Sequence, residues 1–349
     1  MTRTPWSAPI IVILTTLAIP VSGCQEPVGT VAALPDWSTP SGFGLESLFD
    51  SEDEAMIRVA SFNACGVPDL PVADLTPARD RRMRRLCDLL AETAEKEAGW
   101  DIVFLQEVWV NGDRDRVGRC GYDHVVEMDD RTREVPGPMR IFQESADSNL
   151  DTGLMILSRY PVLAAEKLQF RSRPEGDYAG ESYPVKGAYF ALVALPGGER
   201  AWFVNTHVVT VVRTGFDPYE ETRKAQMREI AARLREVNAD GLPAVVGGDF
   251  NLDPRDPSWD ETLAALPGLE SPFSFSPFER SYLGPEIQNG RIDHLRFSSH
   301  WTAVVGRLSP ELTTLSPGSP CDGARALTDP CMLSDHVGIE ATARLGSGG

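Results

Sequence analysis

The segment LPAVVGGDFNLDP, residues 242–254, constrains the fold of this chain more than any other. Its small and β-branched residues, Ala244 to Val246, predict a strand that is buried in a core. The acid Asp249 and the amide Asn251 follow at the end of that strand. Because ligands of α/β sheets bind at strand ends, the segment predicts a sheet whose strand ends form a functional site.

Similar short apolar segments recur along the chain. Alternating or continuous apolar residues predict strands over 56–63, 101–107, 153–158, 186–195, 201–207, 243–249, 291–297 and 336–345. Apolar residues at helical spacing predict amphipathic helices over 79–99 and 217–237. No internal repeat or change of composition divides these elements, so we expect one α/β domain over residues 56–346.

The first residues predict export. Arg3 precedes the apolar stretch APIIVILTTLAIP, which is too short to span a bilayer and fits the apolar region of an export signal. The next residues, VSGC, resemble the lipobox of bacterial lipoproteins, in which the cysteine is lipidated. We therefore expect a lipoprotein signal peptide over 1–23, lipidation of Cys24, a tether over 24–55 and a lipid-anchored protein of the bacterial cell envelope. The alternative is an ordinary signal peptide with a chance cysteine.

The charge balance argues against broad affinity for nucleic acid. Lys and Arg total 33 against 51 Asp and Glu, which gives a formal net charge of −18. A surface with this excess of acids repels phosphate backbones. Solubility outside the cell is a sufficient explanation of the charge.

The cysteines fit an exported protein. Six are present, and removing Cys24 leaves an odd number that cannot all pair within one chain. Cys321 and Cys331 lie close together in a loop-like stretch, where a disulfide would close a short loop. The pairing of the others stays open: Cys65, Cys87 and Cys120. None of the spacings is typical of a zinc site, and Cys65 is interpreted as a small buried hydrophobe.

Several polar residues share a position at or beside a predicted strand end. They are Asn63, Glu107, His207, Asp249, Asn251, Asp293, Asp335 and His336. Each one alone is typical of an exposed strand edge, but together they predict one cleft. The oxygen ligands favour Mg²⁺, or another hard cation such as Mn²⁺, over Zn²⁺. The histidines suit proton transfer near neutral pH.

Seven motifs carry a family resemblance: SFNACG, FLQEVW, DTGLMILSRYP, FVNTH, GGDFNLDP, GRIDHLRF and LSDHVGIEA. Their order and spacing resemble the endonuclease/exonuclease/phosphatase superfamily, which includes deoxyribonucleases, inositol polyphosphate phosphatases and bacterial sphingomyelinases. The resemblance covers residues 56–346. It implies an α/β, four-layer sandwich of two mixed β-sheets flanked by helices.

The resemblance also implies roles for the residues at the strand ends. Asn63, Glu107 and Asp335 match the family's metal ligands.

The remaining residues match the catalytic groups. Asp249 and Asn251 correspond to the pair that orients the nucleophile and binds phosphate. His207 corresponds to a donor to a phosphate oxygen. His336 corresponds to the general base, with Asp293 fixing its tautomer, whereas the neighbouring His294 is expected to serve packing.

The expected activity is metal-dependent phosphodiester hydrolysis. The acidic charge, the predicted anchor and the segments YPVKGAYFAL and ETRKAQMREI favour the sphingomyelinase branch, with phospholipase C type cleavage of sphingomyelin or a related phospholipid. A nuclease acting on DNA or RNA and an inositol or sugar phosphatase remain alternatives, as does a non-catalytic binding lipoprotein. We expect a phospholipid or other phosphodiester substrate, contact with the membrane through Cys24, and no obligate protein partner.

Overall fold

The computed structural model describes residues 56–68, 78–134, 140, 143, 147–148, 150–175, 181, 183–210, 217–272, 290–309, 311–312 and 333–346. The predicted signal peptide, the tether and Cys24 lie outside these residues. Among the described helices, none has the length and apolar character needed to cross a membrane.

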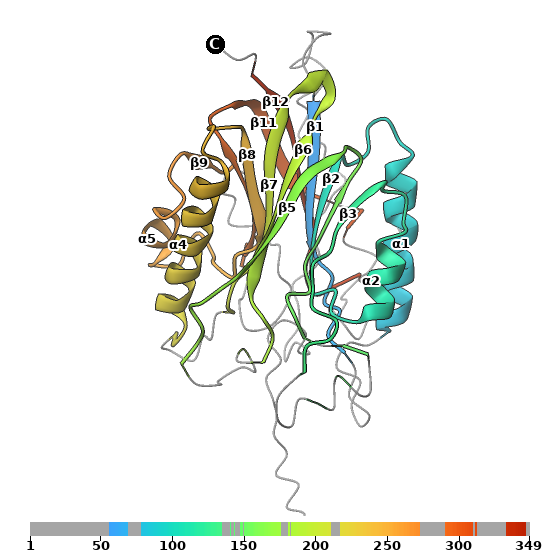
Figure 1. The fold of residues 1–349 in the computed structure, drawn as a ribbon, viewed down its shortest axis with the longest axis vertical. Coiled ribbons are helices and arrows are strands. Elements are labelled where there is room, and N and C mark those ends of the chain that lie inside the picture. Colours follow the sequence, from blue (N-terminus) through green and yellow to red (C-terminus); the bar gives the residue numbers. More distant parts are fainter. Residues whose placement is uncertain are drawn as a thin grey trace, which may run out of the picture.

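Two six-stranded mixed sheets form the centre of the domain (Figure 1). The first has the order β11 (Trp301–Leu308), β12 (Ile339–Leu345), β1 (Met56–Asn63), β2 (Ile102–Gln106), β4 (Met155–Ser158) and β3 (His124–Val126). The second has the order β5 (Val162–Gln169), β6 (Gly187–Ala194), β7 (Arg200–His207), β8 (Ala244–Asp249), β10 (Asp293–Ser298) and β9 (Leu269–Glu270). Pairing is parallel between β1 and β2 and between β7 and β8, and antiparallel between the other neighbours.

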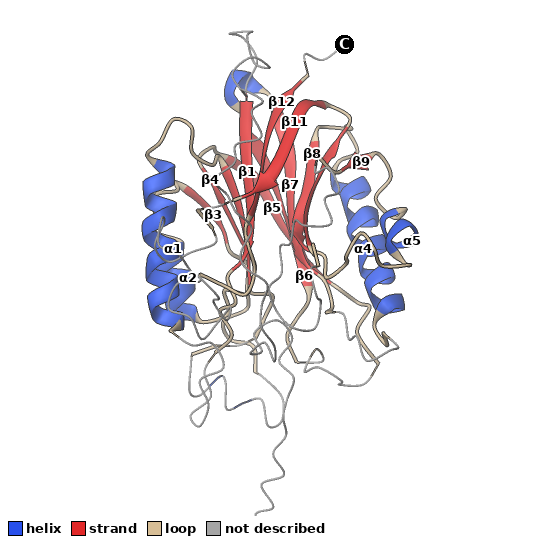
Figure 2. Cartoon of the chain, turned by 180° about the vertical axis from the view of Figure 1, so that it is seen from behind, coloured by secondary structure: helices blue, strands red, loops and turns tan. Residues whose placement is uncertain are grey.

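Helices cover the outer face of each sheet (Figures 1 and 2). The helices α1 (Arg79–Ala94) and α2 (Asn111–Val117) lie on the first sheet, and α4 (Glu220–Val237) and α5 (Trp259–Leu263) lie on the second. A short 3₁₀ turn, η3 (Pro196–Gly198), joins β6 to β7. Apolar residues of α1 and α4 pack onto the outer sheet faces, as the helical spacing predicted. The predicted four-layer sandwich is therefore confirmed.

The core lies between the two sheets. Phe104 of β2, Phe203 of β7 and Leu295 of β10 are fully buried in the same apolar cluster. The two glycines of β8 allow close packing there. A Cβ atom on Gly247 would lie 2.5 Å from the Leu295 side chain. Gly248 has φ +127°, and a Cβ atom there would lie only 2.0 Å from the Thr206 carbonyl oxygen, so no larger residue fits. The GG pair thus lets β8 run through the core up to its terminal acid.

Two disulfide findings bear on the cysteine predictions. Cys87 of α1 is bonded to Cys120, which follows α2, and this bond ties the two helices of the first outer layer together. Cys65 is also disulfide-bonded, so its interpretation as merely a small buried hydrophobe is wrong, although it is fully buried. Cys321 and Cys331, and hence the bridge predicted between them, lie outside the described residues.

Candidate active site

The strand registers bring the predicted site residues to one end of the two sheets. Asn63 ends β1, and Glu107 directly follows its parallel neighbour β2. His207 ends β7 opposite Asp249, the last residue of β8, and Asp293 at the start of β10 lies opposite Asp249 on its other side. Every one of the eight predicted residues is buried, with at most 5% of its surface exposed. Residues spread over most of the chain therefore form one cluster.

Asp249 lies at the centre of this cluster. Its Oδ2 accepts a hydrogen bond from Nδ2 of Asn63 at 3.0 Å and lies 3.5 Å from Nε2 of His207 and 3.8 Å from Nε2 of His336. Its Oδ1 accepts the backbone N–H of Asn251 at 2.9 Å. Burial raises the pKa of Asp249 to about 7, and the negative charge of Asp293 acts in the same direction. One carboxylate thus connects groups from both sheets.

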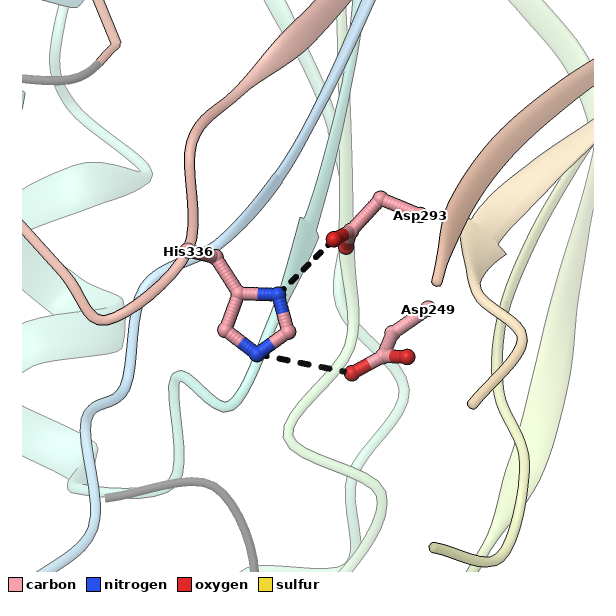
Figure 3. Close-up of side chains that lie close together, drawn as sticks. All are labelled: Asp249, Asp293 and His336. Carbon is pink, nitrogen blue, oxygen red and sulfur yellow. Dashed lines mark hydrogen bonds and ion pairs between the residues drawn. The ribbon is translucent and has the colours of Figure 1, made fainter. Parts of the chain in front are cut away.

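His336 and Asp293 form an oriented pair (Figure 3). Nδ1 of His336 donates to Oδ2 of Asp293 at 2.8 Å, which leaves Nε2 facing Asp249. Burial lowers the pKa of His336, but the charges of Asp293, Asp335 and Asp249 outweigh it and raise that pKa to about 10. The ligand atoms of Asp249, Asp293 and His336 lie within 4.8 Å of one another. Because the Asp293–His336 contact is already a hydrogen bond, we interpret the trio as a proton-transfer group.

A second set of oxygen ligands lies beside Asp249. Nδ2 of Asn63 donates to Oε1 of Glu107 at 3.1 Å, which places Glu107 next to the same amide that contacts Asp249. Burial, with the negative charge of Asp335 acting in the same direction, raises the pKa of Glu107 to about 8. Burial likewise raises the pKa of Asp335 to about 6. Oδ2 of Asp335 is buried and has no hydrogen-bond partner among the described residues. These groups fit a hard cation, which would balance their charge.

Two of the site residues have left-handed backbone conformations. Glu107 has φ +59° and Asn251 has φ +46°, a region that residues other than glycine adopt at a cost of about 1 kcal/mol or more. The Asn251 side chain donates through Nδ2 to the Val208 carbonyl oxygen and accepts from the Thr210 hydroxyl. Glu107 is the first residue after β2, and Asn251 is the second residue after β8. Asp249 and Asn251 are in direct contact through the hydrogen bond from the Asn251 backbone N–H to Oδ1 of Asp249.

Lys186 is a site residue that the sequence reasoning missed. Its Nζ lies 2.9 Å from Nε2 of His207 and 3.3 Å from a carboxylate oxygen of Glu181. An ammonium group has only donors, so Nε2 of His207 accepts the hydrogen bond. Burial lowers the pKa of His207 well below its usual value, and the charges of Lys186 and His336 act in the same direction. The predicted hairpin of β6 and β7 could have revealed Lys186 as a site residue. Its register sets Gly187 opposite His207 and so brings the preceding residue, Lys186, close to that histidine.

His294 lies apart from this chemistry. Its ring is fully buried between Phe250 and Trp259, and Nε2 contacts the Leu252 carbonyl oxygen at 2.8 Å. The predicted packing role of His294 is confirmed.

Comparisons with known proteins agree with this fold. The model of the Endonuclease/Exonuclease/phosphatase family matches residues 60–336. The inositol phosphosphingolipids phospholipase C of Schizosaccharomyces pombe is 27% identical over 200 residues, which cover 57% of this chain and 42% of that protein. The match thus spans less than half of that relative's length.

Solved structures share the fold. Sphingomyelinase C from Streptomyces griseocarneus superposes with a TM-score of 0.58 and 19% identity, over 82% of this chain and 99% of that chain. A beta toxin from Staphylococcus aureus with bound magnesium ions superposes with a TM-score of 0.58 and 16% identity, over 84% of this chain and 100% of that chain. With most of its domain matched by the family model and its fold shared with these structures, the chain belongs to the Endonuclease/Exonuclease/phosphatase family.

Proposed function

We propose that this chain is a divalent-metal-dependent phosphodiester hydrolase that cleaves phosphosphingolipids in the manner of a phospholipase C. The observation that carries this proposal is the buried cluster in which an oriented His336 faces Asp249 beside the oxygen ligands Asn63, Glu107 and Asp335. Such a set combines a proton acceptor with a place for a cation, the two requirements of metal-assisted phosphoester hydrolysis.

The residues present fit a divalent cation. Asn63, Glu107 and Asp335 would hold it through oxygen atoms, and the buried Oδ2 of Asp335, which has no hydrogen-bond partner within the described part of the chain, is suited to bind such an ion. When bound, the ion supplies positive charge that stabilises the negative charge growing on the phosphoryl oxygens. The magnesium in the S. aureus beta toxin supports Mg²⁺ as the ion, and Mn²⁺ shares its ligand chemistry.

His336 is proposed as the general base. Its Nε2 takes a proton from a water molecule, and the oxygen of that water forms a bond to phosphorus while the bond from phosphorus to the lipid oxygen breaks. The lipid oxygen leaves with the bonding electrons and takes up a proton from solvent, which gives the lipid alcohol. Asp293 holds the proton on Nδ1 and stabilises the imidazolium that forms. A general base must begin the reaction unprotonated. A bound cation would balance the negative charge of nearby carboxylates such as Asp335 and so lower the raised pKa of His336, which favours the unprotonated ring.

The other residues are proposed to bind phosphate and orient water. Asp249 accepts from the attacking water, since its Oδ2 already lies between His336 and His207. Lys186 supplies a buried positive charge for the phosphate oxygens. His207, the predicted donor to a phosphate oxygen, would donate through Nδ1, since its Nε2 accepts from Lys186, and Asn251 adds an amide.

The substrate assignment draws on the relatives. The S. pombe relative is named for inositol phosphosphingolipids and the Streptomyces structure for sphingomyelin, so both names describe a phosphorylated head group on a sphingolipid. We propose the same substrate class here. The proposed products are the lipid alcohol and the phosphorylated head group.

A substrate panel tests this function. The purified chain should release phosphocholine from sphingomyelin vesicles with Mg²⁺ present, and a chelator should abolish the release because the buried carboxylates then lack their counter-charge. The same preparation is assayed on phosphatidylcholine vesicles, inositol phosphates and plasmid DNA. Cleavage of DNA without release from either lipid would replace the proposal by a nuclease function.

Substitution of the oriented pair tests the mechanism. We expect His336→Ala to lower kcat on sphingomyelin by a factor of about 10³, because the proton acceptor is lost, and Asp293→Asn to lower it by at least about 10². The matched control is His300→Ala, which removes an exposed histidine whose Nδ1 contacts only Ser298 among the described residues. A folded His336→Ala protein with turnover near that of the control would contradict the assignment.

Metal binding should depend on pH with a defined sign. The raised pKa of Glu107, about 8, means that the metal-free protein holds a proton there at pH 7, and a cation must displace it. Affinity for Mg²⁺ should therefore fall as pH falls from 8 to 6, by up to about tenfold per unit for each proton released. Calorimetry in two buffers of different ionisation enthalpy measures that proton release. An affinity independent of pH over this range would show that Glu107 does not bind the ion.

The membrane anchor remains a proposal. Lipidation of Cys24 after removal of residues 1–23 would hold the domain at the bacterial cell envelope. In a bacterial host, Cys24→Ser should move the protein from the membrane fraction to the soluble fraction, because several acyl chains are lost while the tether and the domain are unchanged. Mass spectrometry of the mature N-terminus is the direct readout. An unmodified Cys24 in a membrane-free protein would reject the anchor.

A further inference from the structure

Two loops that carry proposed metal ligands contact each other, although one lies near the start and the other near the end of the domain sequence. The first loop, residues 63–65, begins with Asn63 at the end of β1. The second, residues 333–336, precedes β12 and carries Asp335 and His336. They belong to segments that are separated by most of the domain sequence. Their relative position therefore depends on tertiary contacts between them.

Arg82 of α1 joins these two loops. Its Nη1 donates to the carbonyl oxygens of Ala64 and Leu333, both at 2.9 Å, and its Nη2 donates to the Cys65 carbonyl oxygen at 2.9 Å. The residue is only 2% exposed. One planar guanidinium thus binds the backbone of both loops. In the first loop it binds the residue that follows Asn63, and in the second it binds the residue two positions before Asp335.

Ser334 makes a second connection between the same loops. Its hydroxyl donates to the Asn63 carbonyl oxygen at 2.7 Å and accepts the backbone N–H of His336 at 3.1 Å. Backbone atoms of the Asn63 loop are therefore held from both the helix and the opposing loop. These backbone contacts therefore set the distance between the side chains of Asn63 and Asp335.

We propose that Arg82 is a positioning residue that fixes the distance between the Asn63 and Asp335 loops and thereby sets the affinity of the site for a divalent cation. This inference rests on the proposed metal-dependent function. A lysine could not reproduce the contact, because its single ammonium lacks the rigid fork that reaches three carbonyl oxygens at once. Groups that orient metal ligands without binding the ion typically change affinity by about 10- to 100-fold.

Arg159 provides a matched control at the other end of α1. Its Nη2 donates to the carbonyl oxygens of Thr93 at 2.5 Å and Lys96 at 2.6 Å, and its Nη1 lies 3.5 Å from Asp101. It therefore also binds backbone carbonyls of this helix and its extension, but it touches neither loop of the site. Loss of either arginine should destabilise the fold, whereas only loss of Arg82 should change the metal site.

The experiment measures Mg²⁺ binding by calorimetry on the full chain and on Arg82→Met, Arg82→Lys and Arg159→Met, with thermal unfolding of the metal-free proteins alongside. We expect Arg82→Met to weaken Mg²⁺ binding by at least about tenfold and Arg82→Lys to recover part of that loss. Arg159→Met should lower the unfolding temperature and leave Mg²⁺ affinity within about twofold of the unsubstituted chain. At saturating Mg²⁺, kcat of Arg82→Lys should approach that of the unsubstituted chain.

Defined results overturn the inference. The inference is wrong if folded Arg82→Met binds Mg²⁺ as tightly as the unsubstituted chain does. It is also wrong if Arg159→Met loses as much Mg²⁺ affinity as Arg82→Met, or if the unsubstituted chain binds no Mg²⁺. If neither Arg82 variant folds, Ser334→Ala decides, because removal of the second connection should weaken Mg²⁺ binding in the same direction and an unchanged affinity rejects the clamp. A chain that binds Mg²⁺ as expected but cleaves no phosphodiester would reject the proposed function and leave the role of Arg82 standing.

Discussion

The site depends on holding several carboxylates close together and away from water. Glu107, Asp249, Asp293 and Asp335 are each at most 2% exposed, and burial of a carboxylate opposes its charged form. The raised pKa values of Glu107, Asp249 and Asp335 are the direct consequence. The protein offsets part of this cost with donors from neutral or cationic groups, above all Asn63 and His336. The remaining negative charge is what makes the cluster suited to a cation.

The sandwich supplies the geometry for this cluster. Parallel strands need a crossover connection, and α1 and α4 provide it for the pairs β1–β2 and β7–β8 on the two outer faces. Each parallel pair delivers two carboxyl ends to the same edge of its sheet. Because the sheets pack face to face, the edges meet, and β10 adds Asp293 from the antiparallel direction. Function at the strand ends is therefore a result of the topology.

The sequence predicted the central strands well because they are apolar on both faces. Segment 56–63 and the strand β1 coincide, and the predicted strand over 243–249 differs from β8 by one residue. The edge strands were missed for physical reasons. Most side chains of β5 are exposed or half-buried, so it lacks an apolar period, and an irregular register between Thr302 and Val305 interrupts the alternation of β11. The strand β3 has only three residues, too few to establish a pattern.

The sequence by itself determined the fold class and which polar residues end the core strands, because apolar periodicity and the residue types at strand ends are local properties of the chain. It therefore placed Asn63, Glu107, Asp249 and His336 on a list of site residues. Tertiary structure alone decided that these residues face one another, that Lys186 contacts His207, and that Arg82 joins two distant loops. In the sequence, a lysine before a strand and an arginine in an amphipathic helix look like ordinary surface residues. Their partners are atoms from remote segments, and only the packing of the sheets and helices brings those atoms within hydrogen-bond distance.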